Sequence, residues 1–382
     1  MSLNPNGSSH KKIEAAGNQA PEIRHLYVHI PFCTHICPYC SFYKTRNTLP
    51  DMKAFLPALK REIEWARSEF DLRPETVFFG GGTPSALSIG QLEDLFEAWP
   101  WKHAVEFTME ANPLTISPAK AQLLKSAGIN RVSLGAQAFD EPSLKILGRT
   151  HRAEDIRKSV QILRETGFEN INLDLMFALP GQTLEQWLAS VRSALELEPE
   201  HISAYNLNYE EDTEFFEKLQ AGVLRIDEGR EREFFHRGMD LLEAGGFEHY
   251  EISNLAKPGH ASLHNRAYWN GSDYIGLGPS ACSTVGLLRW QNVPDTRLYS
   301  KALLESGEPQ RKFEELSLAT KRAERILLGL RVREGVPAEE LGAQKELLTN
   351  LAEAGLIEVL CGRVALTREG RLVADSVTEL FI

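Results

Sequence analysis

The chain has 382 residues, of which 42% are hydrophobic and 25% charged, and its formal net charge is −11 at pH 7. These values indicate an ordinary globular protein with one large domain of about 200–250 residues and a smaller one. The negative charge argues against a general binder of nucleic acid or anionic membranes, and no stretch approaches the ~20 apolar residues of a membrane-spanning helix.

The first 22 residues are polar or small and contain no apolar core of a secretory signal. They are predicted to form a disordered leader. A protein without such a signal is expected in the reducing cytoplasm.

Short apolar runs then alternate with longer amphipathic segments. The predicted strands are 25–30, 76–81, 106–111, 131–136, 171–176 and 201–207, and the predicted helices include 52–70, 118–128, 153–167 and 184–196. Strands separated by helices pair in parallel through right-handed crossovers. The predicted fold class is therefore α/β, a partial (β/α)6 TIM-type barrel. Residues 211–249 are expected to add helices to its outer layer.

Three cysteines, Cys33, Cys37 and Cys40, lie within eight residues in the spacing C-x3-C-x2-C. Three thiolates are one ligand short of a closed zinc site or of a four-cysteine cluster, so one iron of a [4Fe-4S] cluster would stay open. The alternative is zinc with His35 or His29 as the fourth ligand. A disulfide is less favoured, because it leaves one of the three thiols unpaired.

Polar residues gather at the carboxyl ends of the predicted strands, which is where parallel barrels place their sites. They include the glycine run 80–82, Glu110, Gln137, Asp174, and Tyr205 with Asn208. The glycines allow a ligand to approach the backbone closely, or else form a tight loop. A buried carboxylate needs a partner, and an ion pair between Glu110 and Arg131 is the structural alternative to a ligand contact.

The cysteine segment, Tyr27-x-His29-Ile30-Pro31-Phe32-Cys33-x3-Cys37-x-Tyr39-Cys40, resembles the cluster loop of radical S-adenosylmethionine proteins. Within that superfamily the chain is similar to the branch of oxygen-independent coproporphyrinogen III oxidase and the related haem chaperones of the HemW type. Further matches are GGGTPS (80–85), EANP (110–113), RVSLGAQAF (131–139), LGRTH (147–151), DLMFALPGQT (174–183), HISAYNL (201–207), YEISNLAKPG (250–259) and HNRAYW (264–269). Together they cover roughly residues 23–285.

The resemblance implies that Cys33, Cys37 and Cys40 bind three irons of a [4Fe-4S] cluster and that S-adenosylmethionine chelates the fourth. The positions that match its contact residues are Tyr27, Tyr39, Gly81, Gly82, Thr83, Glu110, Gln137, Arg149 and Asp174. The implied chemistry is one-electron cleavage of the sulfonium to a 5′-deoxyadenosyl radical, which requires an electron donor.

Two features separate the chaperones from the oxidases. The oxidase pattern is C-x3-C-x2-C-x-C, with a fourth cysteine two places after the third. That place is Phe42 in this chain. The HNRAYW segment is associated with haem binding in the chaperones, which implies that His264 binds haem, with Tyr268 and Trp269 beside the macrocycle. A histidine packed at a domain junction is the alternative. Cys282, where the family often has histidine, is a rival haem ligand, and Ala178 replaces a frequent glycine.

The expected function is therefore a haem chaperone that passes haem to an acceptor protein. The alternative is a coproporphyrinogen III oxidase or another radical enzyme that acts on a tetrapyrrole. Nucleic acid is not an expected partner, while weak association with a membrane-bound acceptor and a homodimer are left open.

The end of the chain differs in pattern from the rest. Residues 318–336 predict an amphipathic helix, and 343–382 predict a helix, a hairpin with its turn at Gly362, and a final helix. This order is typical of a winged-helix-like α+β domain, and without a dense basic stripe it favours packing or partner docking over DNA binding. The predicted division is a leader (1–22), the barrel (23–249), a haem-binding junction (250–300) and the C-terminal domain (301–382).

Overall fold

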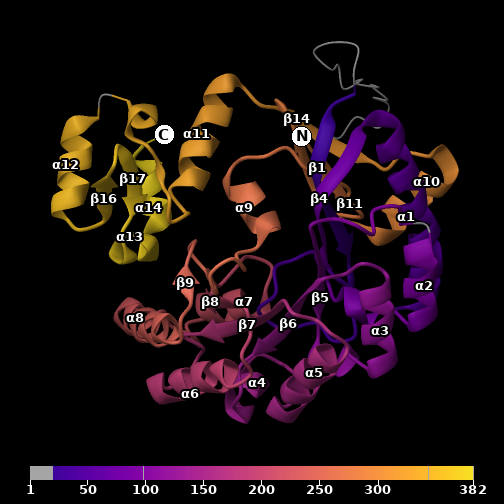
Figure 1. Ribbon diagram of the computed structural model, residues 1–382, viewed down its shortest axis with the longest axis horizontal. Helices are drawn as coiled ribbons and strands as arrows, with labels where there is room; N and C mark the ends of the chain where they lie inside the picture. Colours follow the sequence, from indigo (N-terminus) through magenta and orange to yellow (C-terminus); the bar gives the residue numbers. More distant parts are fainter. Residues whose placement is uncertain (1–19, 98, 343, 382) are drawn as a thin grey trace.

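The structure is a computed structural model that describes residues 20–97, 99–342 and 344–381. Most of the predicted leader lies outside these residues. Within the described part, the main sheet has nine strands in the order β11-β1-β4-β5-β6-β7-β8-β10-β9 (Figure 1). Its six central strands are β1 (Glu22–Ile30), β4 (Asp71–Gly81), β5 (Glu106–Ala111), β6 (Arg131–Gln137), β7 (Ile171–Phe177) and β8 (His201–Asn206). They coincide with the predicted strands, and every neighbouring pair is parallel. The α/β prediction is confirmed.

Helices follow these strands, and most of them cover the outer face of the sheet (Figure 1). They are α1 (Leu49–Glu69), α2 (Ile89–Glu97), α3 (Pro118–Ser126), α4 (Glu141–Ile146), α5 (Ala153–Glu165), α6 (Leu184–Leu195), α7 (Glu214–Gln220) and α8 (Glu228–Ala244). Their ends follow local chemistry. Helix α6 begins with a capping box between Thr183 and Gln186, and α3 is followed by Gly128 at φ +95°. The predicted helices between 211 and 249 are confirmed by α7 and α8.

Three edge strands of the main sheet are not among the predicted elements. They are β9 (Glu248–His249), β10 (Asn254–Ala256) and β11 (Ile275–Leu277). Strand β11 pairs in parallel with β1, whereas β10 pairs antiparallel with β8. Strands of two or three residues are too short to show a two-residue period. Residues 248–277 thus supply both ends of the sheet, with β9 at one edge and β11 at the other.

The two faces of the central strands differ in polarity. The outer face is apolar and forms the main core with the helices, for example through Phe79, Phe107 and Leu134. The inner face carries buried polar side chains, which are Thr76, Glu106, Thr108, Arg131, Ser133, Asn172, His201 and Ser203. Successive side chains of a strand alternate between faces, so this division follows from the two-residue period. Ordinary TIM barrels fill the same space with Val, Ile and Leu.

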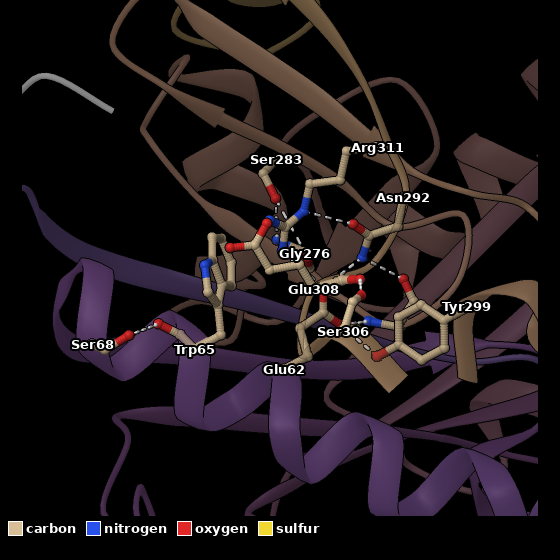
Figure 2. Close-up of polar contacts among 11 residues, drawn as sticks. Glu62, Trp65, Ser68, Gly276, Ser283, Asn292, Tyr299, Ser306, Glu308 and Arg311 are labelled. Atoms are coloured by element: carbon tan, nitrogen blue, oxygen red, sulfur yellow. Dashed lines mark hydrogen bonds and ion pairs between the residues drawn. The ribbon is translucent and has the colours of Figure 1, made fainter. Parts of the chain in front are cut away.

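A buried carboxylate joins the N-terminal helix to the second half of the chain. Glu62 on α1 is 0% exposed and accepts hydrogen bonds from the Gly278 amide at 2.7 Å, the Tyr299 hydroxyl at 2.5 Å and the Asn292 amide at 2.8 Å (Figure 2). The Arg311 guanidinium lies 3.4 Å from the same carboxylate. Gly278 lies in the loop between β11 and β12 (Cys282–Val285). The other partners lie in β13 (Leu288–Asn292), α10 (Thr296–Ser306) and β14 (Arg311–Glu315). A fully paired buried network of this kind fixes one arrangement of these elements.

The C-terminal unit has its own apolar core, which includes Ile326, Leu351 and Val364. It contains α11 (Leu318–Gly329), β15 (Val336–Pro337), α12 (Lys345–Glu353), β16 (Ile357–Leu360), β17 (Arg363–Leu366), α13 (Arg368–Leu372) and α14 (Ala374–Glu379). The hairpin turn is Cys361-Gly362, with both φ angles positive. Helix α11 ends earlier than the predicted 336, because Val336 pairs with Val364 in the small sheet.

This unit (yellow in Figure 1) lies on the opposite side of the main sheet from α1 and α2. The segment between them contains α9 (Leu263–Trp269), which contacts both β4 and α11. In the described part of the chain, no helix is both long and apolar enough to cross a membrane.

Candidate functional site

The three clustered cysteines lie in the loop that follows β1. Cys33 ends the short strand β2 (Phe32–Cys33), which pairs with β3 (Thr45–Arg46), and the Cys40 amide donates to the Cys37 carbonyl at 3.3 Å. All three thiols are free and border one pocket of about 460 Å³ at the carboxyl ends of the strands. The predicted placement of the cysteine loop over this end of the barrel is thus observed.

Polar groups surround these sulfur atoms. The Thr83 hydroxyl is 3.8 Å from Cys33 Sγ, and Arg149 Nη1 is 3.7 Å from Cys37 Sγ. Burial raises the pKa values of the Cys33 and Cys40 thiols. Thiolates at these positions therefore need a cationic partner, which iron of a cluster would supply.

The zinc alternative with His29 does not fit the geometry. His29 Nδ1 lies 3.0 Å from the Tyr27 hydroxyl, and its Nε2 lies 2.8 Å from the Tyr43 carbonyl. Both ring nitrogens are therefore engaged elsewhere. Among the described residues, no group of three or more His, Cys, Asp or Glu side chains is placed to hold a single metal ion.

The glycine run fixes the cysteine loop against β4. Gly81 has φ +104°, and a Cβ on Gly82 would lie 2.6 Å from the Pro31 carbonyl carbon. The Gly82 amide donates to the Ile30 carbonyl at 2.9 Å. Since a side chain at 82 would collide with backbone, the run is required for this close packing and leaves residues 81–83 bordering the pocket.

Two carboxylates face the same pocket. Glu110 accepts a hydrogen bond from the Gly81 amide at 3.1 Å, and Asp174 accepts from the Ser133 hydroxyl at 3.1 Å and the Asn172 amide at 2.8 Å. Burial, reinforced by the charge of Asp174, raises the pKa of Glu110 to about 8, and burial also raises the pKa of Asp174. Neither carboxylate is in direct contact with Arg131, although the charge of Arg131 acts to lower both pKa values. The direct salt bridge between Glu110 and Arg131 is therefore not observed.

The pocket brings together most of the predicted site. Its lining includes Cys33, Cys37, Tyr39, Cys40, Gly81, Gly82, Thr83, Glu110, Gln137, Arg149 and Asp174. Tyr27 does not border the pocket, because its hydroxyl contacts His29 and its ring stacks on Phe78 behind it. Sequence reasoning missed Ser133, Asn172 and Ser203. The two-residue period could have found two of them, because Ser133 lies four residues before Gln137 and Asn172 two residues before Asp174. Ser203 pairs in register with Asp174 on the neighbouring strand.

The HNRAYW segment forms α9 at the opposite end of the barrel. Glu106 accepts from the Ser262 hydroxyl at 3.0 Å and from the Leu263 and His264 amides at 2.8 and 3.0 Å, which anchors the helix N-terminus to β5. His264 is 1% exposed, with Nδ1 2.8 Å from the Thr76 hydroxyl and its ring stacked on Phe78. Burial lowers its pKa to about 3, so the imidazole is neutral.

Helix α9 borders two cavities. Asn265 lines the pocket of the cysteine loop, whereas Arg266, Tyr268 and Trp269 line a second cavity of about 920 Å³ between α9 and α11. The Trp269 indole nitrogen is buried there without a hydrogen-bond partner. Predicted residue His264 lines neither cavity, and Cys282 lies exposed on β12 outside both.

Comparison with known proteins agrees with this geometry. A model of the radical SAM superfamily matches residues 27–194. The haem chaperone HemW of Bacillus subtilis is 39% identical over 376 residues, which is 94% of this chain and 99% of that protein. HemW of Escherichia coli is 32% identical and covers 94% of this chain and 97% of its own length.

Among solved structures, the coproporphyrinogen III oxidase HemN of Escherichia coli, a radical SAM enzyme, is similar with a TM-score of 0.80 and 25% identity. The alignment covers 95% of this chain and 90% of that one. Identity at this level to HemW proteins, over nearly the full length of both partners, is decisive for the family. The chain belongs to the HemW family of the radical SAM superfamily.

Proposed function

We propose that this protein is a haem chaperone that binds haem and transfers it to an acceptor protein, and that it carries a [4Fe-4S] cluster with S-adenosylmethionine. One observation carries the proposal. The HNRAYW helix lies between the cysteine-loop pocket and a second cavity large enough for a macrocycle, and it contributes residues to both. The family relationship supports the same function.

The pocket residues fit the cluster and its ligand. Cys33, Cys37 and Cys40 would hold the cluster, and the guanidinium of Arg149 beside Cys37 would stabilise its negative charge. Glu110 and Asp174 offer carboxylate oxygens for amino and hydroxyl groups of S-adenosylmethionine, and Tyr39, Gln137 and residues 81–83 complete the wall. When bound, this pair of cofactors supplies a 5′-deoxyadenosyl radical after one-electron reduction.

The second cavity suits a flat ligand with acidic arms. Tyr268 and Trp269 offer aromatic surface, and Arg266, Arg289 and Arg325 are among its cationic residues. The iron ligand is proposed to be His264, whose Nε2 has no partner among the described residues, with exposed Cys282 as its rival. Because His264 is 1% exposed, its use as a ligand requires α9 to move.

An anaerobic haem titration of the reconstituted protein tests this proposal. The wild type is expected to give a stoichiometric Soret band. His264→Ala should shift or abolish the band if this imidazole binds iron, and Cys282→Ser should do so if the thiol binds iron. Trp269→Ala should weaken binding in both cases, because it removes cavity surface. A wild-type protein that binds no haem would refute the proposal.

A second candidate is porphyrinogen oxidation, which the likeness to the HemN structure favours. The position of the oxidases' additional cysteine is Phe42 here, whose side chain is 69% exposed and borders the pocket. Formation of protoporphyrinogen from coproporphyrinogen III in an anaerobic assay would establish the enzyme. If no product forms and haem binds stoichiometrically, the oxidase function is excluded and the chaperone function is supported.

The remaining assignments extend the proposal. We propose that the protein acts in the cytoplasm and receives electrons from a donor. Crosslinking would identify the haem acceptor, any membrane-bound partner and a homodimer. We propose the same division into a barrel (23–249), a haem-binding junction (250–300) and a C-terminal domain (301–382). The C-terminal domain then closes the second cavity, because α11 and Val336 line that cavity opposite α9.

A further inference from the structure

A buried guanidinium without a partner lies inside the barrel. Arg131, the first residue of β6, is 2% exposed and borders the cysteine-loop pocket together with Ser133, Gly135 and Gln137 on the same face of the strand. It forms no hydrogen bond or ion pair with any residue that the structure describes, and its Nε is buried without a partner. Its charge interacts with the carboxylates of Glu110 and Asp174 without direct contact. A buried guanidinium whose N–H groups donate to no protein acceptor is nevertheless costly.

Other buried arginines of the chain are paired. Arg311 is 7% exposed, and its guanidinium contacts Glu62 at 3.4 Å and Asn292 at 3.1 Å (Figure 2). Arg149 donates to Cys37 Sγ and to the Gly135 carbonyl at 3.3 Å. The Nε of Arg149 is also buried without a partner, but its other nitrogens donate. Arg131 differs because no nitrogen of its guanidinium donates to a described residue.

A second unpartnered group is its neighbour on the adjacent strand. Thr108 on β5 pairs in register with Arg131, and its hydroxyl is buried without a hydrogen-bond partner. Neighbouring strands lie about 4.8 Å apart, so side chains in register on one face are adjacent. Thr108 does not itself border the pocket, and its hydroxyl lies beside Arg131, so it can donate to an acceptor that the guanidinium holds.

The position lies below the predicted S-adenosylmethionine contacts. Arg131 and Gln137 are six positions apart in β6, a span of roughly 20 Å along the strand. We call the level of Thr108 and Arg131 the barrel base. Phe78 lies in the same row on β4 and borders the pocket, so the pocket reaches this level.

The surroundings favour a singly charged acceptor. Glu110 and Asp174 accept hydrogen bonds from Gly81, Ser133 and Asn172 and act on Arg131 through their charge, without a direct hydrogen bond to it. Where these carboxyl groups are ionised, they would repel a dianion such as phosphate more than a monoanion. A carboxylate also matches the planar fork of arginine with two parallel hydrogen bonds.

We propose that Arg131 and Thr108 form a carboxylate-binding site at the barrel base, which receives an acidic group of a ligand that enters the pocket beside S-adenosylmethionine. The site is independent of the haem cavity proposed above. A carboxylate at this position would accept hydrogen bonds from both the Arg131 guanidinium and the Thr108 hydroxyl.

The test uses acetate as the probe on the reconstituted protein with cluster and S-adenosylmethionine. Thermal unfolding is followed anaerobically in sodium acetate, sodium phosphate and sodium chloride at equal ionic strength. Acetate is expected to raise the Tm of the wild type over chloride by about 2–5 °C at concentrations well above its Kd. Each variant is compared with itself in chloride, so its own change in stability cancels.

The acetate-specific rise should vanish in Arg131→Met and shrink in Thr108→Val, while Arg131→Lys keeps part of it. Arg67→Met, which removes a positive charge from the exposed side of α1, should keep all of it. Thr108→Val preserves the side-chain volume, and Arg131→Lys preserves the charge. If Arg131→Met does not fold, these two variants test the proposal. No rise in the wild type, an equal rise in Arg131→Met, or a larger effect of phosphate would each overturn the proposal. None of these results depends on haem binding.

Discussion

Glu110 should make the cofactor-free protein less stable as the pH rises. The pKa of its carboxyl in the fold is about 8, against 4.5 for the ordinary group, because burial and the charge of Asp174 disfavour ionisation. Between these values the folded state holds a proton that the unfolded chain releases, so the free energy of unfolding falls as pH increases from about 4.5 to 8. At about 1.4 kcal/mol per pH unit the full effect is about 5 kcal/mol.

Because Glu110 is only partly buried at the edge of the pocket, we expect about half of this value, or ~2–3 kcal/mol. Glu110→Gln keeps an acceptor for the Gly81 amide and removes the titration. Its Tm should exceed that of the wild type by about 2–4 °C at pH 8.5, and the two should converge toward pH 5.

The assay is thermal unfolding of cofactor-free wild type and variant from pH 5 to 9. Glu93→Gln, on the exposed side of α2, is the matched control for the loss of a carboxylate outside the pocket. A Glu110→Gln protein that differs from the wild type by the same amount at every pH would refute the reasoning. So would a variant that is less stable at pH 8.5.

Three further perturbations have expected outcomes. Cys37→Ser should lose the cluster, and a variant that retains full iron and cluster absorption would contradict the ligand assignment. Gly82→Ala should lower cluster occupancy and cost about 1–3 kcal/mol in urea unfolding, because its Cβ meets the Pro31 backbone, whereas Gly90→Ala has open space and should be neutral or stabilising. Glu62→Leu should cost about 3–5 kcal/mol by leaving Arg311 unpaired, and the double variant with Arg311→Met should recover part of it.

The sequence predicted the central strands and the cysteine site well, because both depend on local spacing. Apolar runs with a two-residue period located β1 and β4–β8, and three cysteines in eight residues need no tertiary information. The glycine run was also recognised, since only glycine tolerates the backbone contact at position 82.

Other features depend on contacts far apart in the chain. Glu62 is one acid among several on an amphipathic helix, and its burial is decided by partners more than 200 residues away. Short polar residues such as Ser133 and Ser203 are common in loops, and only strand register places them in the pocket. The histidine of HNRAYW was expected to face a ligand, but helical periodicity alone does not tell which face of α9 meets the barrel.

The pairing of Glu62 with Arg311 also sets an order of events during synthesis. The two residues are 249 positions apart, so at 5–20 residues per second α1 waits roughly 12–50 s for its partner to emerge. Strand β11, which flanks the strand that leads into the cysteine loop, appears late as well. Until then the nascent N-terminal half has neither the partners of Glu62 nor the strand that flanks β1, so the sheet beside the cysteine loop stays incomplete until the second half has emerged.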